Sequence, residues 1–291
     1  MPVPLPYNFG GLPREYSGYK NAHIAILPVP FDRTSSWIKG SSRGPRAIID
    51  ASRHMELYDI ETGSEVYLKG ISTAKDIVAG NSLDMIDRVH KRVQKMLSDG
   101  KFVVVLGGEH TVSLGAIKAH LERFKDLSIL HLDAHSDMRD SYEGDKYSHA
   151  CIMARTRELT GNIVSAGIRS MDSSEIKNIN GKNMFYASSI HHSKDWIKKV
   201  RGRLTRNVYI TIDLDVFDPS IMPSTGTPEP GGLGWYEVLD LLESVAARHT
   251  IAGFDVVELC PSKANPAPDF LAAKLTYKLL SLTFSAEAPK I

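Results

Sequence analysis

Two short stretches of the sequence place acidic residues and histidine at alternate positions directly after an apolar run. HLDAHSD, residues 131–137, follows the run 127–130, and TIDLDVFDP, residues 211–219, follows 207–210. Side chains two positions apart on an extended chain point the same way, so each stretch would present its acids on one side. The side chains concerned are Asp133, His135, Asp137, Asp213 and Asp215.

A third stretch, VVVLGGEHTVSLG (103–115), ends an apolar run in two glycines and places His110 at the start of a predicted helix. All three stretches follow predicted strands, and the carboxyl ends of parallel strands are where open α/β sheets bind ligands. Four carboxylates that converge there repel strongly, because two unit charges about 4 Å apart interact with roughly 4 kcal/mol at an effective dielectric of 20. Two divalent cations would balance them, with His110 and His135 as neutral ligands.

This ligand set narrows the choice of metal. It is rich in oxygen, contains two imidazoles and lacks thiolates, which favours Mn²⁺ over structural zinc and leaves Zn²⁺, Fe²⁺ or Co²⁺ as alternatives in vitro. We therefore predict two Mn²⁺ ions per chain. A solvated loop is the alternative for a single Asp-x-His-x-Asp stretch. A phosphate cradle is the alternative for the glycine pair, although the G-x-G-x-x-G and G-x-x-x-x-G-K-[ST] patterns are both absent.

The composition argues against several other classes of partner. The chain has 291 residues, with 35 lysines and arginines spread along it against 34 aspartates and glutamates, so we expect no nucleic-acid or membrane partner. Residues 1–16 lack a basic segment followed by an apolar one, and no apolar run approaches the roughly 18 residues that span a bilayer. Cys151 and Cys260 form no CxxC motif, and we interpret them as small buried side chains in a reducing cytoplasm.

The elements that must position these residues alternate along the chain. Apolar runs typical of buried parallel strands occur at 23–27, 102–106, 127–132, 162–168, 208–214 and 251–259. Between them the sequence predicts helices that begin near Pro45, after Ser82 as N-cap, and near residue 234. This alternation predicts a mostly parallel sheet covered by helices on both faces. The chain contains no repeat or linker, and 222–234 is interpreted as a functional loop, so residues 1–291 are predicted to form one domain.

Together these stretches resemble a known family. LGGEH (106–110), DAHSD (133–137) and DLDVFDP (213–219) resemble the three metal-binding signatures of the ureohydrolases, the family that contains arginase and agmatinase. Further blocks resemble that family in the same order, at 28–52, 147–155, 225–233 and 253–261. The resemblance covers nearly the whole chain. It implies a three-layer α-β-α sandwich with an eight-stranded parallel sheet, dependence on Mn²⁺, hydrolysis of a guanidino group to urea, and a homo-oligomer of three or six chains.

The same resemblance assigns the metal ligands. It implies that Asp133 and Asp213 bridge the two metals. The remaining ligands would divide into two pairs, one for each metal: His110 with Asp137, and His135 with Asp215.

It also assigns a substrate site and shows two departures from the family pattern. Glu258 would hold the guanidinium, with Thr227 nearby; a surface glutamate is the alternative. Glu109 stands where many members have Asp, which is a common variation. SKAN (262–265) follows ELCP where many agmatinases place an acidic residue, which leaves the loop 262–268 without an assigned role.

The expected reaction explains why such a site is needed. A guanidinium carbon is a poor electrophile, and a pair of divalent cations lowers the pKa of water to roughly 7, so that a metal-bridging hydroxide can attack it. The leaving amine then needs a proton, which Asp137 would pass on from that hydroxide. His149 is the predicted shuttle to solvent, because imidazole exchanges protons near neutral pH. A loop histidine bonded to a carbonyl is the alternative.

The predicted substrate is agmatine, hydrolysed to putrescine and urea as a step in polyamine biosynthesis. The loop MRDSYEGDKYSHA (138–150) contains Asp140, Glu143 and Asp145, which would form an acidic rim that repels a carboxylate and accepts an amine. Arg139 argues for arginine, guanidinobutyrate or another guanidino acid instead, and aminopropylagmatine would also suit a pocket for an amine. A two-metal phosphoesterase and a non-enzymatic metal-binding relative are the rivals from other classes. They are disfavoured because this loop is not basic and no ligand is missing.

Overall fold

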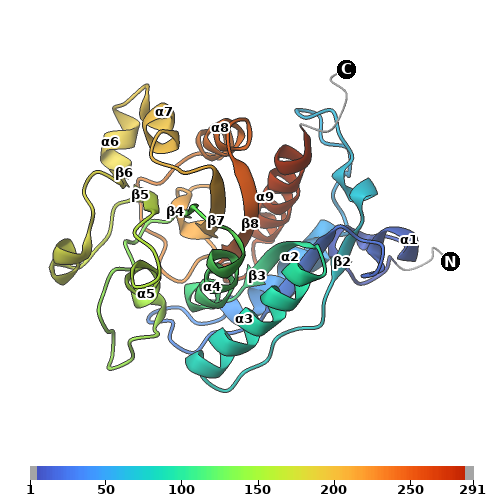
Figure 1. Ribbon diagram of the computed structural model, residues 1–291, viewed down its shortest axis with the longest axis horizontal. Coiled ribbons are helices and arrows are strands. Elements are labelled where there is room, and N and C mark those ends of the chain that lie inside the picture. The colour runs from blue at the N-terminus through green and yellow to red at the C-terminus, as the bar shows by residue number, and fades with distance from the viewer. Residues whose placement is uncertain (1–4, 286–291) are drawn as a thin grey trace.

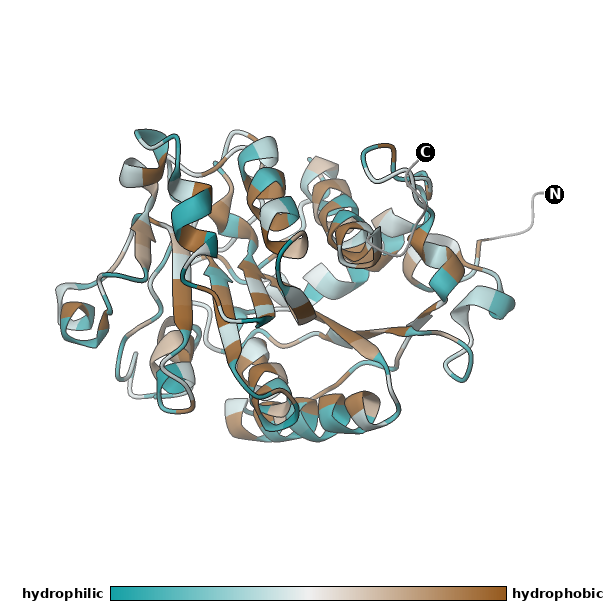
Figure 2. Ribbon diagram, turned by 45° about the horizontal axis from the view of Figure 1, so that its top comes forward, coloured by the Kyte–Doolittle hydropathy of each residue, from teal (hydrophilic) through white to brown (hydrophobic). Residues whose placement is uncertain are grey.

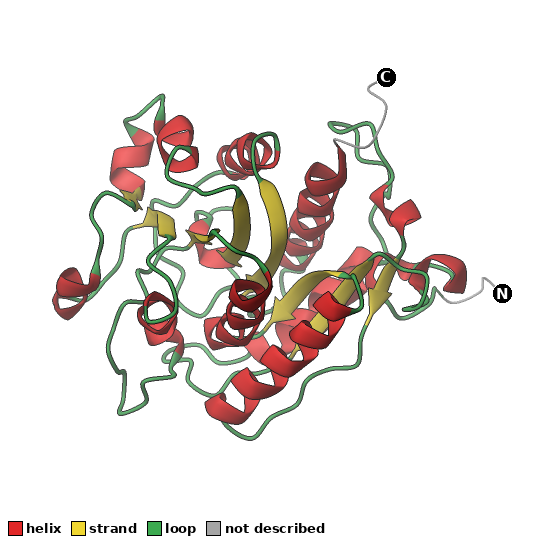
Figure 3. Ribbon diagram, in the orientation of Figure 1, coloured by secondary structure: helices red, strands yellow, loops and turns green. Residues whose placement is uncertain are grey.

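The computed structural model describes residues 5–285; residues 1–4, which begin the stretch searched for a targeting signal, and residues 286–291 lie outside the described part. Helices and strands alternate along the chain (Figures 1 and 3). The strands are β1 (Ile24–Val29), β2 (Ile71–Thr73), β3 (Phe102–Gly107), β4 (Leu127–Leu132), β5 (Ile163–Ile168), β6 (Met184–Tyr186), β7 (Asn207–Asp213) and β8 (Thr250–Val257). The helices are α1 (Arg14–Ser17), α2 (Gly44–Ser52), α3 (Ser82–Ser98), α4 (Ser113–Arg123), α5 (Ile152–Arg157), α6 (Ala187–His191), α7 (Trp196–Arg201), α8 (Trp235–Ala246) and α9 (Ala267–Phe284). None of these described helices is both long enough and apolar enough to cross a bilayer.

Within residues 5–285 the eight strands form one sheet in the order β2-β1-β3-β8-β7-β4-β5-β6. Every neighbouring pair is parallel, which confirms the predicted α/β fold. The six inner strands are those predicted from apolar runs. The two edge strands, β2 and β6, have three residues each, too few for an apolar pattern to be recognised in the sequence.

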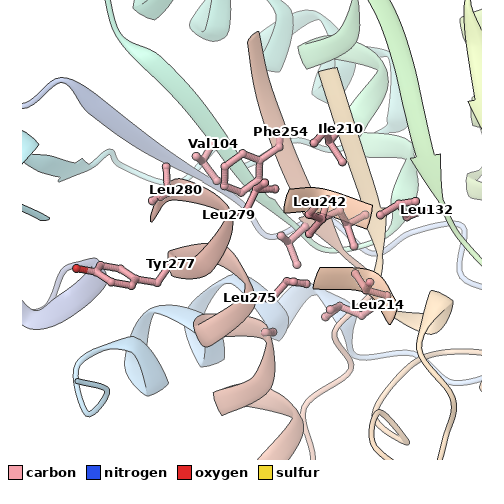
Figure 4. Packing of buried hydrophobic residues seen from close by; sticks show 14 of the residues in the cluster. Val104, Leu132, Ile210, Leu214, Leu242, Phe254, Leu275, Tyr277, Leu279 and Leu280 are labelled. Atoms are coloured by element: carbon pink, nitrogen blue, oxygen red, sulfur yellow. The ribbon is translucent and has the colours of Figure 1, made fainter. Parts of the chain in front are cut away.

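Alternate side chains of the inner strands build two apolar cores, one on each face of the sheet. Val104 and Phe254 belong to the core that packs against α2, α7, α8 and α9, whereas Val105 belongs to the core against α3, α4 and α5. Figure 4 shows the first core, where Phe254 lies close to Leu279 of α9. Figure 2 shows the largely brown strands between helices above and below, which gives the three layers.

The helix starts show how closely local signals set the boundaries. α2 begins at Gly44 with Pro45 in its first turn, as predicted. The predicted N-cap of α3, Ser82, is wrong, because Asn81 caps this helix and its side-chain oxygen accepts a hydrogen bond from Asp84 N at 3.0 Å. Asn and Ser are nearly equal as N-caps, so adjacent candidates are not separated by residue type.

The order of the sheet brings the predicted site to one edge. The adjacent central strands β3, β8, β7 and β4 all run in the same direction, so their carboxyl ends lie together. From β4 the chain continues to β5 on one side, and from β7 it continues to β8 on the other, so the strand order reverses between the neighbours β4 and β7, and α/β sheets bind ligands beside such reversals.

We predict a measurable dependence of stability on pH from His120 of α4, which is fully buried. Its Nδ1 donates to Ala116 O at 2.8 Å, and burial lowers its pKa to about 4. An unfolded histidine titrates near pH 6.5, so between that value and about pH 4 the unfolded chain binds more protons and the fold loses stability as the pH falls. The free energy of unfolding should fall by up to about 3 kcal/mol across this window, as measured by urea denaturation.

His120→Gln removes the titrating ring and should flatten this part of the pH profile. The matched control is His54→Gln, which removes an exposed histidine and should keep the slope. An equal slope in His120→Gln and wild type would contradict the assignment.

Candidate metal centre and active-site cavity

The first group of predicted ligands gathers around His110, which follows β3 and opens the 3-10 turn η4 (His110–Val112). Its Nδ1 lies 3.0 Å from Asp133 Oδ2, 3.1 Å from Asp137 Oδ2 and 3.6 Å from Asp213 Oδ2. Asp133 directly follows β4, and Asp213 is the last residue of β7. The ends of three strands thus hold one imidazole against three carboxylates, all of them buried.

The second group lies around His135. Its Nδ1 is 2.9 Å from Asp215 Oδ2 and 3.6 Å from Asp133 Oδ1. Asp215 also holds the turn after β4, because its Oδ1 accepts from Ala134 N at 2.9 Å. Asp133 turns one oxygen toward each group, as a bridging ligand would. The structure therefore brings the six predicted ligands together.

The orientation of His110 fits a bound metal. Its Nε2 lies 2.9 Å from Thr211 Oγ1, and the Thr211 hydroxyl donates to Asp255 Oδ1 at 2.6 Å. Thr211 can therefore only accept from Nε2–H, which directs the lone pair of Nδ1 toward the carboxylates. His110 Nδ1 is buried and has no hydrogen-bond partner in the described chain. A lone pair that faces carboxylate oxygens is repelled by them unless a cation lies between, so these residues suit a metal ion.

The charges of the cluster lead to the same conclusion. Burial raises the pKa of Asp213 well above its ordinary value, and the carboxylates of Asp215 and Asp133 raise it further. Burial opposes a charge on His135, but the same two carboxylates outweigh it and raise the pKa of His135 to about 12. The excess of negative charge thus attracts positive charge, which protons or metal ions can supply. Oxygen and imidazole donors without thiolate suit a divalent cation such as Mn²⁺.

The segment 133–137 differs from the extended chain on which its prediction was based. Asp137 has φ of +52°, in the left-handed region, and its carbonyl accepts from Met153 N at 2.9 Å and Ala154 N at 3.1 Å. These bonds tie the turn to the start of α5 and direct the Asp137 side chain into the cluster. Glu258, just beyond β8, has φ of +66°. Such strained conformations of non-glycine residues persist where the surrounding structure fixes them, typically at functional sites.

A cavity of about 230 Å³ opens onto both groups of ligands. Three other predicted residues, His149, Thr227 and Glu258, line it as well. Glu258 Oε1 accepts from His110 N at 2.7 Å, which fixes this carboxylate beside the cluster. Burial raises the pKa of Glu258 well above its ordinary value, and the neighbouring charge of Glu109 raises it further. Of the residues assigned from the sequence to metal binding, proton transfer and guanidinium binding, all but Asp133 therefore line one cavity, and Asp133 is fully buried against His110.

His131 is a site residue that the sequence reasoning missed. Its Nε2 lies 2.8 Å from Asp133 Oδ2 and its Nδ1 lies 3.0 Å from Ser165 Oγ. Together with His110, Asp133 and Asp137 it forms a buried group whose ligand atoms are close enough to hold one ion. The signal was present, because His131 is two residues before Asp133 on the same face of β4.

Two further contributions come from Arg169, which belongs to no recognised motif, and from Glu109, whose contacts the sequence did not indicate. Arg169, one residue after β5, donates from Nη2 to Asp215 O at 2.6 Å and to Glu229 O at 2.9 Å, so it links the ligand turn to the loop that contains Thr227. Glu109 is fully buried, and its Oε2 accepts from Thr34 N at 2.6 Å. Arg169 and Glu109 each bind residues that are distant in sequence, so the spacing of nearby residues could not indicate these contacts.

The predicted acidic rim is wrong in its residues. Asp140 pairs with Lys177 at 2.7 Å, Asp145 accepts from Tyr147 N at 2.8 Å, and neither they nor Glu143 line the cavity. The loop 138–150 does reach the cavity, but it lines it with Arg139, Tyr142, His149 and Ala150 instead of with these three acids.

The cavity is instead lined by Arg139, Asp172 and Glu175. Arg139 Nη2 lies 3.5 Å from Asp172 Oδ2, and its Nε lies 3.7 Å from Glu175 Oε1. These three side chains comprise two carboxylates and one guanidinium, so acidic groups outnumber basic ones here.

Several known proteins are similar to this chain in sequence and in fold. Two relatives named N(1)-aminopropylagmatine ureohydrolase are similar: one from Synechocystis is 35% identical over 94% of each chain, and one from Thermus thermophilus is 38% identical over 91% of each. The crystal structure of an agmatine ureohydrolase from Thermoplasma volcanium superposes with a TM-score of 0.84 at 33% identity, and 93% of each chain is covered. A profile of the arginase family matches residues 22–281. The chain therefore belongs to the arginase family and is a ureohydrolase, a hydrolase of guanidino carbon–nitrogen bonds.

Proposed function

We propose that the protein binds two Mn²⁺ ions and hydrolyses agmatine to putrescine and urea, as a step in polyamine biosynthesis. The observation that carries this proposal is that one cavity contains the histidine and aspartate cluster, Glu258, and the acidic pair Asp172 and Glu175. A substrate with a guanidinium at one end and an amine at the other has a matching charge for each of these features. The bound metals would supply activation of water, by lowering its pKa to roughly 7.

Glu258 is proposed to orient the guanidinium. One of its oxygens, Oε1, is held by His110 N, while Oε2 has no hydrogen-bond partner in the described chain and lines the open cavity. A planar guanidinium donates well to such a fixed carboxylate. Thr227 borders the same space and would contact the substrate beside it. This pairing offsets the repulsion between a cationic substrate and a dinuclear metal site.

Proton movement is assigned to Asp137 and His149. The Asp137 carboxylate faces the cluster and lines the cavity, so it can transfer a proton from the attacking water to the departing nitrogen. A neutral amine is a viable leaving group, whereas its anion is not. His149 lines the same cavity and would exchange that proton with solvent.

The substrate tail is proposed to end in an amine. Arg139 would attract a carboxylate, but Asp172 and Glu175 already surround it, and the net charge of the three favours a cation. Aminopropylagmatine is a second candidate, because the relatives from Synechocystis and Thermus thermophilus carry that substrate in their names. Assembly into trimers or hexamers and a cytoplasmic location stay predictions; light scattering would test the first.

We expect equilibrium dialysis to find two Mn²⁺ ions per chain. Asp133→Asn should weaken both sites and abolish most activity, because Asp133 faces both ligand groups. Asp215→Asn should weaken mainly the site around His135, the group to which it belongs. A single tight site in the wild type would rule out the binuclear proposal.

The substrate is tested by kcat/KM for agmatine, aminopropylagmatine, arginine and guanidinobutyrate at one Mn²⁺ concentration. The two amines should be preferred, and Asp172→Asn should lower kcat/KM for them about fivefold, the size expected for one partly exposed charge. Asp140→Asn is the matched control, since Asp140 is outside the cavity and pairs with Lys177. Turnover of arginine or guanidinobutyrate at least as efficient as that of agmatine would refute the amine assignment.

The proton shuttle is tested by His149→Asn. This change should lower kcat by roughly 10² to 10⁴, the usual contribution of a general acid or base, and leave the metal content intact. Added imidazole should restore part of the rate. Glu258→Gln should raise KM as well as lower kcat, because it weakens substrate capture. An unchanged kcat in His149→Asn would remove that residue from the mechanism.

A further inference from the structure

Thr34 lies between a buried carboxylate and the ring of His149. Its Oγ1 is 2.8 Å from Glu109 Oε1 and 3.2 Å from His149 Nδ1, and it also accepts from His149 N at 3.0 Å. The three residues come from distant parts of the sequence, so the fold builds this contact chain beside the cavity that His149 lines.

Glu109 holds Thr34 in place at one end of this series of contacts. It is fully buried, and its Oε2 accepts from the backbone N–H of Arg33 at 2.8 Å, Thr34 at 2.6 Å and Ser35 at 3.2 Å. Its Oε1 accepts from the hydroxyls of Thr34 and Thr111. Five donors converge on this one carboxylate, which therefore serves as an acceptor throughout and holds the loop in place.

These contacts determine which way the Thr34 hydroxyl points. Its single proton can go to Glu109 at 2.8 Å or to the imidazole at 3.2 Å, and the shorter, charge-assisted bond to carboxylate is the stronger. Thr34 Oγ1 therefore offers only lone pairs to His149. It can accept from the backbone N–H and from Nδ1–H, which uses its full capacity of one donated and two accepted bonds.

We propose that Thr34, anchored on Glu109, is a positioning residue that fixes His149 in the tautomer with the proton on Nδ1. The other ring nitrogen, Nε2, has no bond to the described part of the chain, and in this tautomer it carries the lone pair that takes up a proton. The bond from Nδ1 to Thr34 persists when Nε2 is protonated, so the ring keeps its orientation through a transfer cycle. The kinetic consequence rests on the proposed function of His149; the tautomer itself does not.

Ser148 competes with Thr34 for His149 Nδ1 and could favour a different tautomer of the ring. Its Oγ also lies 3.2 Å from His149 Nδ1, and a proton donated from this hydroxyl would favour the opposite tautomer, with hydrogen on Nε2. The edge contact between His149 and Tyr142, with ring centroids 5.7 Å apart, helps to hold the ring whichever hydroxyl prevails. Replacing each hydroxyl in turn therefore separates the two possibilities.

The tautomer can be read by long-range ¹H–¹⁵N correlation NMR on the full-length chain labelled with ¹⁵N-histidine. The protein is loaded with diamagnetic Zn²⁺ in place of Mn²⁺ and held at a pH about two units above the ordinary imidazole pKa. The His149 signal is assigned by its loss in His149→Asn. We expect hydrogen on Nδ1 in the wild type, in Thr34→Ser and in Ser148→Ala, and a shift toward Nε2–H in Thr34→Val.

The matched control is Thr111→Val, which removes another hydroxyl bond to Glu109 Oε1 and leaves both hydroxyls beside His149 Nδ1 in place, so it should retain the Nδ1–H tautomer. Hydrogen on Nε2 in the wild type would overturn the proposal. So would a tautomer that changes in Ser148→Ala and stays constant in Thr34→Val.

Kinetics provide the second readout. Thr34→Val should lower kcat about tenfold, the effect of one lost hydrogen bond, with KM near the wild-type value, and Thr34→Ser should restore it. Because Thr34 acts through His149, the double variant Thr34→Val/His149→Asn should be no slower than His149→Asn alone. Multiplied losses in the double variant would show an independent structural role and refute the positioning role. A wild-type protein inactive on every guanidino compound would instead refute the proposed function, and the NMR measurement alone would then decide the tautomer.

Discussion

Buried negative charge at the carboxyl ends of four central strands is the constraint on which the rest of the site depends. Carboxylates removed from water destabilise a fold by several kcal/mol each unless they are compensated. Parallel strands bring these side chains together whether or not their charges are balanced, because the direction of the strands is fixed by the sheet. The cluster therefore has to be stabilised by its own backbone and by cations.

The backbone contribution is visible in the turns that follow β4 and β7. His135 N donates to Asp133 Oδ1 at 2.5 Å, and Asp215 N donates to Asp213 Oδ1 at 2.9 Å, so each aspartate organises the turn that presents the next predicted ligand. The alternating spacing in the sequence thus does more than align side chains. It places an acceptor two residues before each N–H that must be satisfied when the strand ends.

The sequence was most informative where local pattern and tertiary role coincide. The inner strands are apolar on both faces, as central parallel strands must be, and the six predicted ligands are marked by residue type and spacing. The edge strands β2 and β6 were missed because three residues are too few to show an alternating apolar pattern. The acidic rim was misplaced because the composition of the loop 138–150 does not show which of its side chains face the cavity, and Asp172 and Glu175 reach the cavity from a different segment. The contacts of Thr34 and Arg169 are set by distant segments that only the folded chain brings together.

Arg169 connects two segments of the protein that are separate in sequence. Its guanidinium reaches the carbonyl of Asp215 in the ligand turn and that of Glu229 in the loop containing Thr227, so one planar group holds both segments. Changes in the length of that loop would remove an acceptor and loosen the backbone that carries a ligand. A change of substrate range through this loop would thereby also disturb the cluster of predicted ligands, whereas Asp140 in the loop 138–150 pairs with Lys177 outside the cavity and can be exchanged without touching the ligand turn.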